Sequence, residues 1–518
     1  MNSRKLWFAA FAASFFVVSA SAATLPTATE IFNKMGFGIN IGNTMEVPGN
    51  PTAWGNKFPS EAYIDSVKAA GFSTIRIPCA WDSHAKDGVI SRSWMDSVQV
   101  VVDRCMRAGL ITILNIHWDG GWLEENLKDD KKSEVNAKQK AYWTQIATHF
   151  KNYNERLLFA SANEPATTDD NYRHETEILA TYHQTFVDAV RATGGNNASR
   201  TLIIQGPSTS IDRSVEVYQV SKLPKDNIEG RLMFEVHYYD PYTYTLLNDV
   251  VDWGAQVYPQ YYWGTGDNLA SGSGVVHNCG YNAWAGAMGD PCTKSQMDAS
   301  LGKMKANYVD KGVPVIIGEF GANDRVGVLS GSDYDRHRKG RLAYYESFMN
   351  SCKANKVVPI AWDTGHEGEN NMTIIRRQSE PDGSVFDKDV LNIMRKAYGL
   401  GDYVNNGITH VENFVDGDTP SSSSSVASPG SSSSVPLCDA MIPECGWTGL
   451  RSVPSATVKF STGLARDGSM LRASANIRLF DMNGNLVRSA GKNMNLQGLN
   501  RGLYVAKSGK EFLKVDIR

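Results

Sequence analysis

The 518-residue sequence lacks the features that mark several common protein classes. Its one long apolar run, Leu6 to Val18, is shorter than the ~20 residues needed to cross a bilayer. The net charge is only −3, and residues 437–518 hold 12 Lys and Arg against 6 Asp and Glu, so the rest of the chain is acidic. An acidic main body with a basic tail does not resemble a nucleic-acid-binding protein. We therefore expect neither a stable membrane span nor a nucleic-acid partner.

Signatures of cofactor and metal chemistry are also missing. No glycine-rich phosphate loop follows the first predicted strand, residues 37–43, as a dinucleotide-binding fold would require. No histidine at the spacing of a catalytic metal site accompanies the acidic residues near predicted strand ends, which are Asp119, Asp240, Asp324 and Asp363. We expect the protein to work without a cofactor and without a metal.

Cysteines are few, and their number is odd, at seven. Cys279 and Cys292 lie in a Gly- and Asn-rich stretch that a disulfide could close, and Cys438 and Cys445 could pair locally. The remaining three fall in strand or helix patterns, where a buried free thiol is expected, and these are Cys79, Cys105 and Cys352.

The N-terminus has the pattern of an export signal. Arg4 and Lys5 precede the apolar run, and Ala20-Ser21-Ala22 is a small-residue cleavage site. We expect residues 1–22 to be a cleaved signal peptide, which makes the protein secreted or cell-surface and permits disulfides.

Two runs of serine, Ser421 to Ser425 and Ser431 to Ser434, define a linker at residues 419–436. Residues 24–418 form the large domain that precedes it. Residues 437–518 follow it, and alternating apolar residues with a turn at Met482 to Asn485 predict a small all-β sandwich there.

Within the large domain, short apolar runs alternate with longer amphipathic stretches. Eight such β/α units predict a (β/α)8 TIM barrel, and a doubly wound open sheet is the competing arrangement. The predicted strands are residues 37–43, 74–78, 111–117, 157–164, 201–206, 232–239, 313–319 and 357–363.

Polar and aromatic residues stand where nearly every predicted strand ends. A strand buried on both faces has no structural reason to carry such residues at its end, and the carboxyl ends of barrel strands meet at one mouth. Two are glutamates that face each other there if the barrel forms, the arrangement that glycoside hydrolysis needs. The residues are Arg76, His117, Asn163, Glu164, His237, Tyr239, Glu319 and Trp362.

Six short motifs, in this order, resemble glycoside hydrolase family 5: Arg76-Ile77-Pro78, Asn115-Ile116-His117, Asn163-Glu164-Pro165, His237-Tyr238-Tyr239, Gly318-Glu319-Phe320-Gly321 and Ala361-Trp362-Asp363. Residues 40–44, which include Asn43, resemble the opening strand of a cellulase subfamily that also includes xyloglucanases and lichenases. The resemblance covers most of residues 30–400 and implies a retaining mechanism through a covalent glycosyl-enzyme.

The resemblance also implies the roles of the two glutamates. Glu319 would attack the anomeric carbon, while Glu164 would protonate the leaving oxygen and then activate water, with the carboxyl groups about 5–5.5 Å apart. Arg76 near Glu319 would depress the pKa of that carboxyl, and Tyr239 could donate a hydrogen bond to it. The negative charge of Glu319 would help Glu164 to keep its proton.

The other candidate residues would bind the substrate. Asn163 would bond the sugar 2-hydroxyl, His117 and His237 would bind hydroxyls or orient the glutamates, and Trp362 would floor a sugar subsite. Asn43 and Trp118 join them, the latter because a loop aromatic makes a platform for sugar rings. In several cellulase relatives a second His or a Glu follows the strand-three histidine, whereas Trp118-Asp119 follows it here, which leaves open the sugar next to the cleavage point.

The leading hypothesis is an exported, retaining endo-β-1,4-glucanase acting on cellulose or a related β-glucan polysaccharide. A xyloglucanase, a mixed-linkage glucanase and a mannanase stay open, because they differ in loop contacts to sugar hydroxyls and branches. A non-catalytic polysaccharide-binding barrel would be expected to lack one of the two glutamates. We expect a monomer.

The tail domain permits three interpretations: a carbohydrate-binding module, a spacer and a sorting or anchoring domain. It has few aromatics for sugar binding. Residues 479–484 and 502–505 resemble C-terminal sorting domains of proteins exported across some bacterial outer membranes, which implies the export machinery as a partner.

Overall fold

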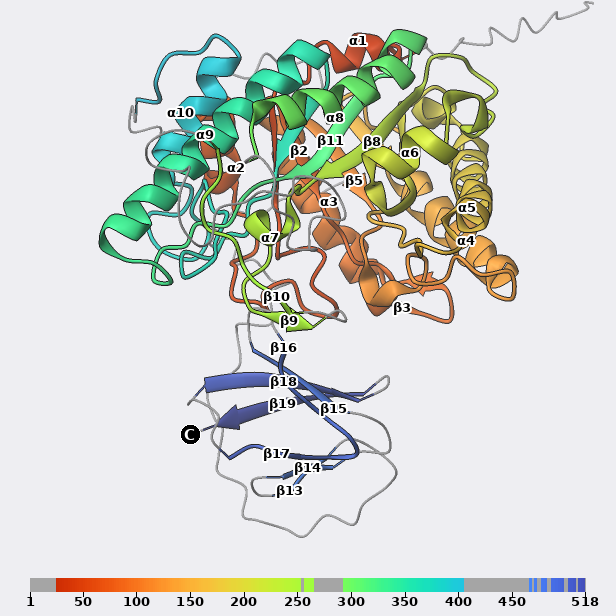
Figure 1. The fold of residues 1–518 in the computed structure, drawn as a ribbon. Coiled ribbons are helices and arrows are strands. Elements are labelled where there is room, and N and C mark those ends of the chain that lie inside the picture. The colour runs from red at the N-terminus through yellow and green to blue at the C-terminus, as the bar shows by residue number, and fades with distance from the viewer. Residues whose placement is uncertain are drawn as a thin grey trace, which may run out of the picture.

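The computed structural model describes residues 25–252, 256–264 and 292–404, together with parts of 465–517. Eight parallel strands close into a barrel in the order in which they occur along the chain (Figure 1). They are β1 (Gly38–Asn40), β2 (Thr74–Ile77), β5 (Ile111–Asn115), β6 (Leu157–Ala160), β7 (Leu202–Gln205), β8 (Leu232–Tyr238), β11 (Val315–Phe320) and β12 (Val358–Ala361). Because β1 pairs with both β2 and β12, the sheet has no free edge. The predicted TIM barrel is confirmed, and the open sheet is excluded.

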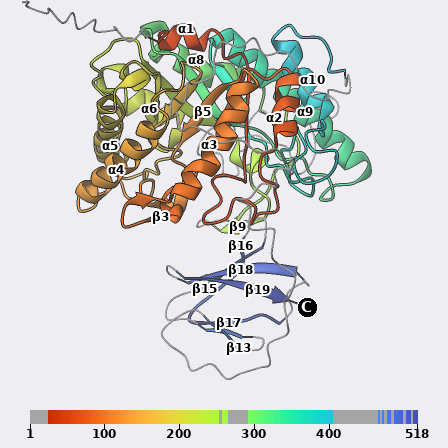
Figure 2. The same ribbon diagram turned by 180° about the vertical axis from the view of Figure 1, so that it is seen from behind.

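Helices surround the barrel, as the two opposite views show (Figures 1 and 2). Several begin where a Ser or Asp side chain accepts a hydrogen bond from the first turn, such as Ser91 at α3 and Asp387 at α10. The helices are α2 (Glu61–Ala69), α3 (Arg92–Arg107), α4 (Lys132–His149), α5 (Tyr172–Ala192), α6 (Ile211–Val217), α8 (Lys294–Asn307), α9 (Gly331–Asn355) and α10 (Lys388–Ala397).

Shorter elements lie in the connections. They are α7 (Tyr242–Thr245), the strand pairs β3 (Ala85–Lys86) with β4 (Val89–Ile90) and β9 (Val251–Asp252) with β10 (Gln256–Val257), and the 3-10 turns Asp82–His84, Asp119–Gly121, Gly195–Ala198, Pro207–Thr209, Val220–Lys222 and Val309–Lys311. Among the described residues, no helix is both long and apolar enough to cross a membrane.

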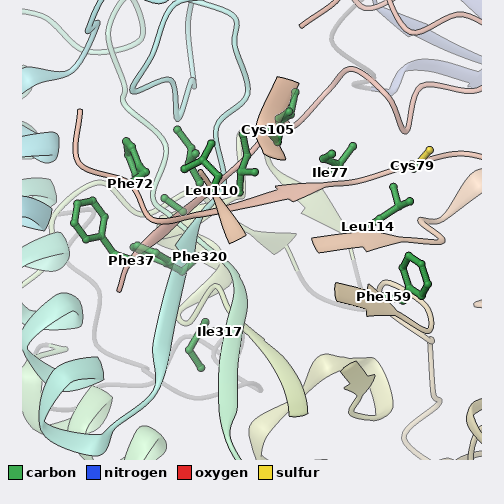
Figure 3. Close-up of a cluster of buried hydrophobic side chains, with 14 of the residues drawn as sticks. Phe37, Phe72, Ile77, Cys79, Cys105, Leu110, Leu114, Phe159, Ile317 and Phe320 are labelled. Atoms are coloured by element: carbon green, nitrogen blue, oxygen red, sulfur yellow. The ribbon is translucent and has the colours of Figure 1, made fainter. Parts of the chain in front are cut away.

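The main hydrophobic core lies between the barrel and its helices. Phe37, Phe72, Leu114 and Phe320 belong to it, and Figure 3 shows part of the cluster. Cys79, Cys105 and Cys352 are buried free thiols, as predicted. The partner predicted for Cys292 and both cysteines of the 438–445 pair lie outside the described residues, so these disulfides stay predictions.

A second core fills the barrel interior and is closed by α1 (Ala28–Phe32). Ala28, Ile31 and Met35 pack against inward residues of the strands, such as Ile113 and Ile316. Thr27 and Glu30 cap this short helix reciprocally. The helix lies at the opposite end of the barrel from β9 and β10 (Figure 1). The chain after α10 returns to the end that α1 closes, where the Tyr398 ring packs 5.3 Å from that of Phe37.

The C-terminal part, taken by itself, consists of antiparallel sheets. One has the order β13 (Ala465–Asp467), β14 (Met470–Arg472), β17 (Asn493–Asn495), and the other β16 (Leu486–Ala490), β15 (Ile477–Asp481), β18 (Gly502–Ser508), β19 (Glu511–Ile517). Residues of both sheets, such as Leu471 and Tyr504, share one buried cluster. Antiparallel strands are present as predicted, whereas the predicted turn at 482–485, the linker and residues 1–22 lie outside the described residues.

Candidate active site

Two glutamates come together at the carboxyl ends of β6 and β11. An oxygen of Glu164 and one of Glu319 lie within 4.8 Å of each other, although the residues are far apart in sequence. The Glu164 side chain is 44% exposed and that of Glu319 only 7%, so one glutamate reaches into solvent and the other lies deep. The geometry that the sequence predicted for the pair is therefore present.

A bulge in β11 aims Glu319 into the mouth. Ile317 pairs with Val236 of β8 but Glu319 pairs with His237, so Gly318 is an extra residue between the two pairs. Bulges commonly re-aim a side chain next to an active site. Asn40 of β1 holds the bulge, because its Nδ2 donates to the Gly318 carbonyl at 2.9 Å.

Gly318 also makes room for a buried acid, Glu235 of β8. A Cβ on Gly318 would lie 1.8 Å from Glu235 Oε1, so any larger side chain would displace that carboxylate. Glu235 is fully buried in the barrel interior, and its Oε2 accepts a hydrogen bond of 2.6 Å from Gln205 of β7.

The Arg76 guanidinium links three strands beneath the mouth. Its Nη1 donates to Glu319 Oε1 at 2.9 Å, its Nη2 donates to Asn163 Oδ1 at 2.6 Å, and its Nε lies 3.1 Å from Glu235 Oε1. Tyr239 donates from its hydroxyl to the other Glu319 oxygen at 3.1 Å. Both oxygens of Glu319 thus accept hydrogen bonds, from the two residues that the sequence placed beside it.

His237 sits between three carboxylates. Its Nδ1 is 2.6 Å from Glu164 Oε1 and 3.7 Å from Glu319 Oε2, and its Nε2 is 3.2 Å from Glu235 Oε1. Burial would lower the pKa of His237, but the charge of Glu319 and the contacts with Glu164 and Glu235 raise it to about 10. This raised pKa favours the imidazolium form of His237 at neutral pH.

The pKa shifts of Glu164 and Glu319 differ from those expected from the sequence. Burial alone would raise the pKa of Glu164, but the hydrogen bond and charge of His237 hold it below its usual range. Burial raises the pKa of Glu319, against the pull of His237 and Arg76. The expectation that the charge of Glu319 would help Glu164 to keep its proton did not include His237, whose hydrogen bond and charge lower the pKa of Glu164.

Glu124, in the loop after β5, fixes the backbone that presents Glu164. Its Oε1 accepts from the backbone N–H of Asn163 at 3.0 Å and of Glu164 at 2.6 Å, and its carbonyl accepts from Ala166 at 2.9 Å. Burial, with the nearby charge of Glu164, raises the pKa of Glu124 to about 8.

A second group of predicted residues lies around β12. The His117 and Trp362 rings are stacked 5.9 Å apart, and the Trp362 ring lies so close to Gly42 that a Cβ there would be 2.8 Å from it. Asn43 is half-buried, at a φ of 56°, and its backbone N–H donates to the buried Glu46. Trp118 is 37% exposed and donates from Nε1 to Glu125 at 3.0 Å. No contact with a sugar tests these residues, so their binding roles stay predictions.

The acidic residues that could resemble metal ligands mostly have other partners. Asp119 accepts from the backbone N–H groups of residues 81, 82 and 83, Asp363 from those of residues 365, 374 and 375, and Asp324 pairs with Arg338. One group of described residues has the spacing of metal ligands, Glu164, His237 and Glu319. Nδ1 of His237 lies 2.6 Å from Glu164 Oε1, and Arg76 adds a positive charge, so these three residues suit proton transfer better than binding of a metal cation.

Sequence reasoning missed the supporting residues Asn40, Glu124, Gln205 and Glu235. Glu235 could have been found, because it lies two residues before His237 and alternation places both on the barrel interior. Glu124 lies in an irregular loop and gives no such signal.

Comparisons with known proteins agree with this geometry. The chain is 35% identical over 357 residues to the xyloglucan-specific endo-beta-1,4-glucanase of Bacteroides ovatus, which covers 66% of this chain and 65% of that relative. It is 33% identical over 412 residues to endoglucanase A of Paenibacillus barcinonensis, covering 74% of this chain and 93% of the relative. A crystal structure of a GH5 xyloglucan-specific beta-1,4-glucanase from a ruminal metagenomic library, in complex with XXLG, superposes with a TM-score of 0.62 at 33% identity, covering 75% of this chain and all of that one (100%). Residues 39–368 match the cellulase family, and the chain therefore belongs to glycosyl hydrolase family 5.

Proposed function

We propose that the protein is a retaining endo-β-1,4-glucanase. The observation that carries this proposal is the distance between the oxygens of Glu164 and Glu319, which lie within 4.8 Å. Retaining enzymes place their carboxyl groups about 5–5.5 Å apart, whereas inverting enzymes leave about 6.5–9.5 Å for a water molecule. The short separation of the two oxygens supports the retaining arrangement.

The surroundings of the two glutamates support their separate roles. Glu319 is deep and is held by Arg76 and Tyr239, as suits a nucleophile that must stay in one position. Glu164 is more exposed and can reach a leaving oxygen in the cleft. Asn163 accepts from Arg76 through its oxygen, which leaves its amide nitrogen to donate to a sugar 2-hydroxyl.

A cavity of about 410 Å³ adjoins Glu164, which supports a place for the leaving group on this side. Glu164 lines it and Glu319 does not, as expected if the acid serves the departing sugar. Hydroxyls, carboxylates and rings suited to sugars line it: Ser208, Thr209, Ser210, Asp212, Tyr239, Asp240, Tyr242 and Ser300. If the rings of Trp362, His117 and Trp118 also bind sugars, the substrate would be held on both sides of the cleaved bond, as internal cleavage of a polymer requires.

The polymer that we propose is a β-1,4-glucan, with xyloglucan as the second candidate. Both the Bacteroides ovatus relative and the superposed crystal structure are described as xyloglucan-specific. Product analysis on carboxymethylcellulose, xyloglucan, lichenan and mannan tests the choice. We expect oligosaccharides from at least one glucan, released first as the β-anomer in proton NMR spectra. Cleavage of mannan alone, or release of the α-anomer, would contradict the proposal.

Export and sorting are a separate part of the proposal. The pattern of residues 1–22 supports cleavage and secretion, and the resemblance of residues 437–518 to sorting domains supports a role in export. Expression of a chain that ends at Asp418 tests the second point. Normal export of that chain, with loss of binding to insoluble cellulose, would show that the tail binds substrate and does not sort.

A further inference from the structure

The environment of His237 determines where its protons lie. Nδ1 and Nε2 each face a carboxylate oxygen, at 2.6 Å from Glu164 and 3.2 Å from Glu235. An ionised carboxylate only accepts hydrogen bonds, and a neutral imidazole carries one hydrogen. Either His237 is an imidazolium, or one of the two carboxyl groups holds a proton.

Glu235 cannot be the group that holds it. Its Oε1 lies 3.1 Å from Arg76 Nε, and its Oε2 accepts a hydrogen bond of 2.6 Å from Gln205. A carboxylate with a guanidinium and an amide donor at its oxygens is ionised. The mobile proton therefore belongs to the pair of His237 and Glu164.

We propose that His237 stores the proton that Glu164 delivers to the leaving oxygen, and that Glu235 is the positioning residue that keeps the proton there. The proposal rests on the roles given to Glu164 and Glu319 above. It deepens them, because it identifies the source of the acid's proton in a site where Glu164 starts ionised.

Protons and electrons balance in both steps of the reaction, formation of the glycosyl-enzyme and its hydrolysis. Glu164 first takes a proton from Nδ1. As the bond between C1 and the glycosidic oxygen breaks, its electron pair goes to that oxygen, which takes the proton from Glu164 and leaves Glu164 ionised again. Glu319 supplies the electron pair of the new bond to C1. In the second step water attacks C1, the electron pair of the ester bond returns to Glu319, and the proton of water returns through Glu164 to Nδ1.

The charges around His237 favour a proton on its imidazole ring. The carboxylates of Glu164, Glu235 and Glu319 face His237. The nearby cation is Arg76 of β2, and the Tyr239 phenol is uncharged. Burial keeps the pKa of His117, after β5, far below its usual range, so that ring is neutral. Transfer from Nδ1 to Glu164 converts an ion pair into two neutral groups, so the net charge of the buried site does not change. Such a transfer avoids moving an isolated charge out of water.

The variant Glu235→Gln keeps the size of the side chain and removes its charge. An opposite charge at this distance shifts a pKa by about 1–3 units. Since loss of the stored proton ends acid catalysis, we expect the basic limb of the kcat/KM profile to move down by about 1–3 pH units. The matched control is Gln205→Met, which removes a donor to the far oxygen of Glu235 but leaves its charge, and its basic limb should stay in place.

The direct test is nitrogen NMR of the full-length protein labelled with 15N-histidine. His237 is assigned by the resonance lost in His237→Asn, and His183, a buried histidine bonded to Ser161 and the Gln205 carbonyl, provides a neutral reference. We expect both ring nitrogens of His237 to carry hydrogen at pH 8 in the native protein and in Gln205→Met. In Glu235→Gln we expect one of them to lose its hydrogen at a pH about 1–3 units lower than in the native protein.

Three results would overturn the inference: a neutral His237 in the native protein at pH 8, an unchanged His237 in Glu235→Gln, or the same shift of the basic limb in Gln205→Met. The NMR measurement does not depend on enzymatic turnover. Absence of hydrolysis on every glucan would overturn the proposed function and leave the protonation of His237 as a separate result.

Discussion

Replacement of Gly318 by Ala should destabilise the barrel through a single contact. The added Cβ would lie 1.8 Å from Glu235 Oε1 and 2.6 Å from its carboxyl carbon. Gly318 does not have a positive φ, so alanine meets no backbone strain at this position. The change in the free energy of unfolding therefore reports only on the clash between the added Cβ and Glu235.

The magnitude follows from the partners that Glu235 would lose. An approach of 1.8 Å exceeds what small shifts absorb, so the carboxylate must move away from Arg76 and His237. Breaking a buried ion pair costs about 3–5 kcal/mol. Gly321→Ala is the matched control in the same segment, because its Cβ would meet the flexible thioether of Met372 at 2.6 Å, an overpacking that costs about 1–3 kcal/mol.

Urea denaturation followed by tryptophan fluorescence measures both free energies of unfolding. The Glu235→Ala background completes a double-mutant cycle, in which Gly318→Ala should cost much less because the clashing group is gone. The reasoning is refuted if Gly318→Ala costs no more than Gly321→Ala, or if it costs the same with and without the Glu235 side chain.

Three further predictions concern the reaction. Glu319→Ala and Glu164→Ala should each lose most turnover while calorimetry still detects binding of an oligosaccharide, because each removes transition-state chemistry; near-normal hydrolysis by either would contradict the assignment. Tyr239→Phe removes a hydrogen bond to a charged oxygen, typically worth about 1.5–3 kcal/mol, so kcat/KM should fall by roughly 10- to 150-fold. Burial already raises the pKa of Glu319, and loss of a donor to its ionised form raises that pKa further. The acidic limb of the pH–activity profile should therefore move to higher pH in Tyr239→Phe. An unmoved acidic limb would contradict the assignment of Glu319 as the ionised group. Treatment with a chelator should leave turnover unchanged, and a loss that returns when metal is added would refute a metal-free reaction.

Much of the architecture could be predicted because barrel strands are short, apolar and followed by polar residues. The runs that end at Glu164 and at Glu319 carry this signal, and each predicted strand corresponds to an observed one. Arg76, Tyr239 and the two glutamates follow from the same rule, since the ends of parallel strands must converge.

The residues that could not be predicted act through tertiary contacts. The hydrogen bonds that Glu124 accepts from the backbone N–H groups of residues 163 and 164 depend on how a loop folds back over β6, which periodicity does not specify. Alternation along β8 places Glu235 inside the barrel with His237, but the contacts that Glu235 makes with Arg76, Gln205 and His237 depend on tertiary structure.

The closure of the barrel by α1 has a practical consequence for immobilising the protein. Leu25 leads into α1, and Tyr398 packs beside Phe37, so both ends of the described barrel depart from the face farthest from the glutamates. In a chain limited to residues 25–404, a tag, bead or surface tethered through either end would leave the opening turned outward, and an insoluble fibre could approach it without contact with the attachment.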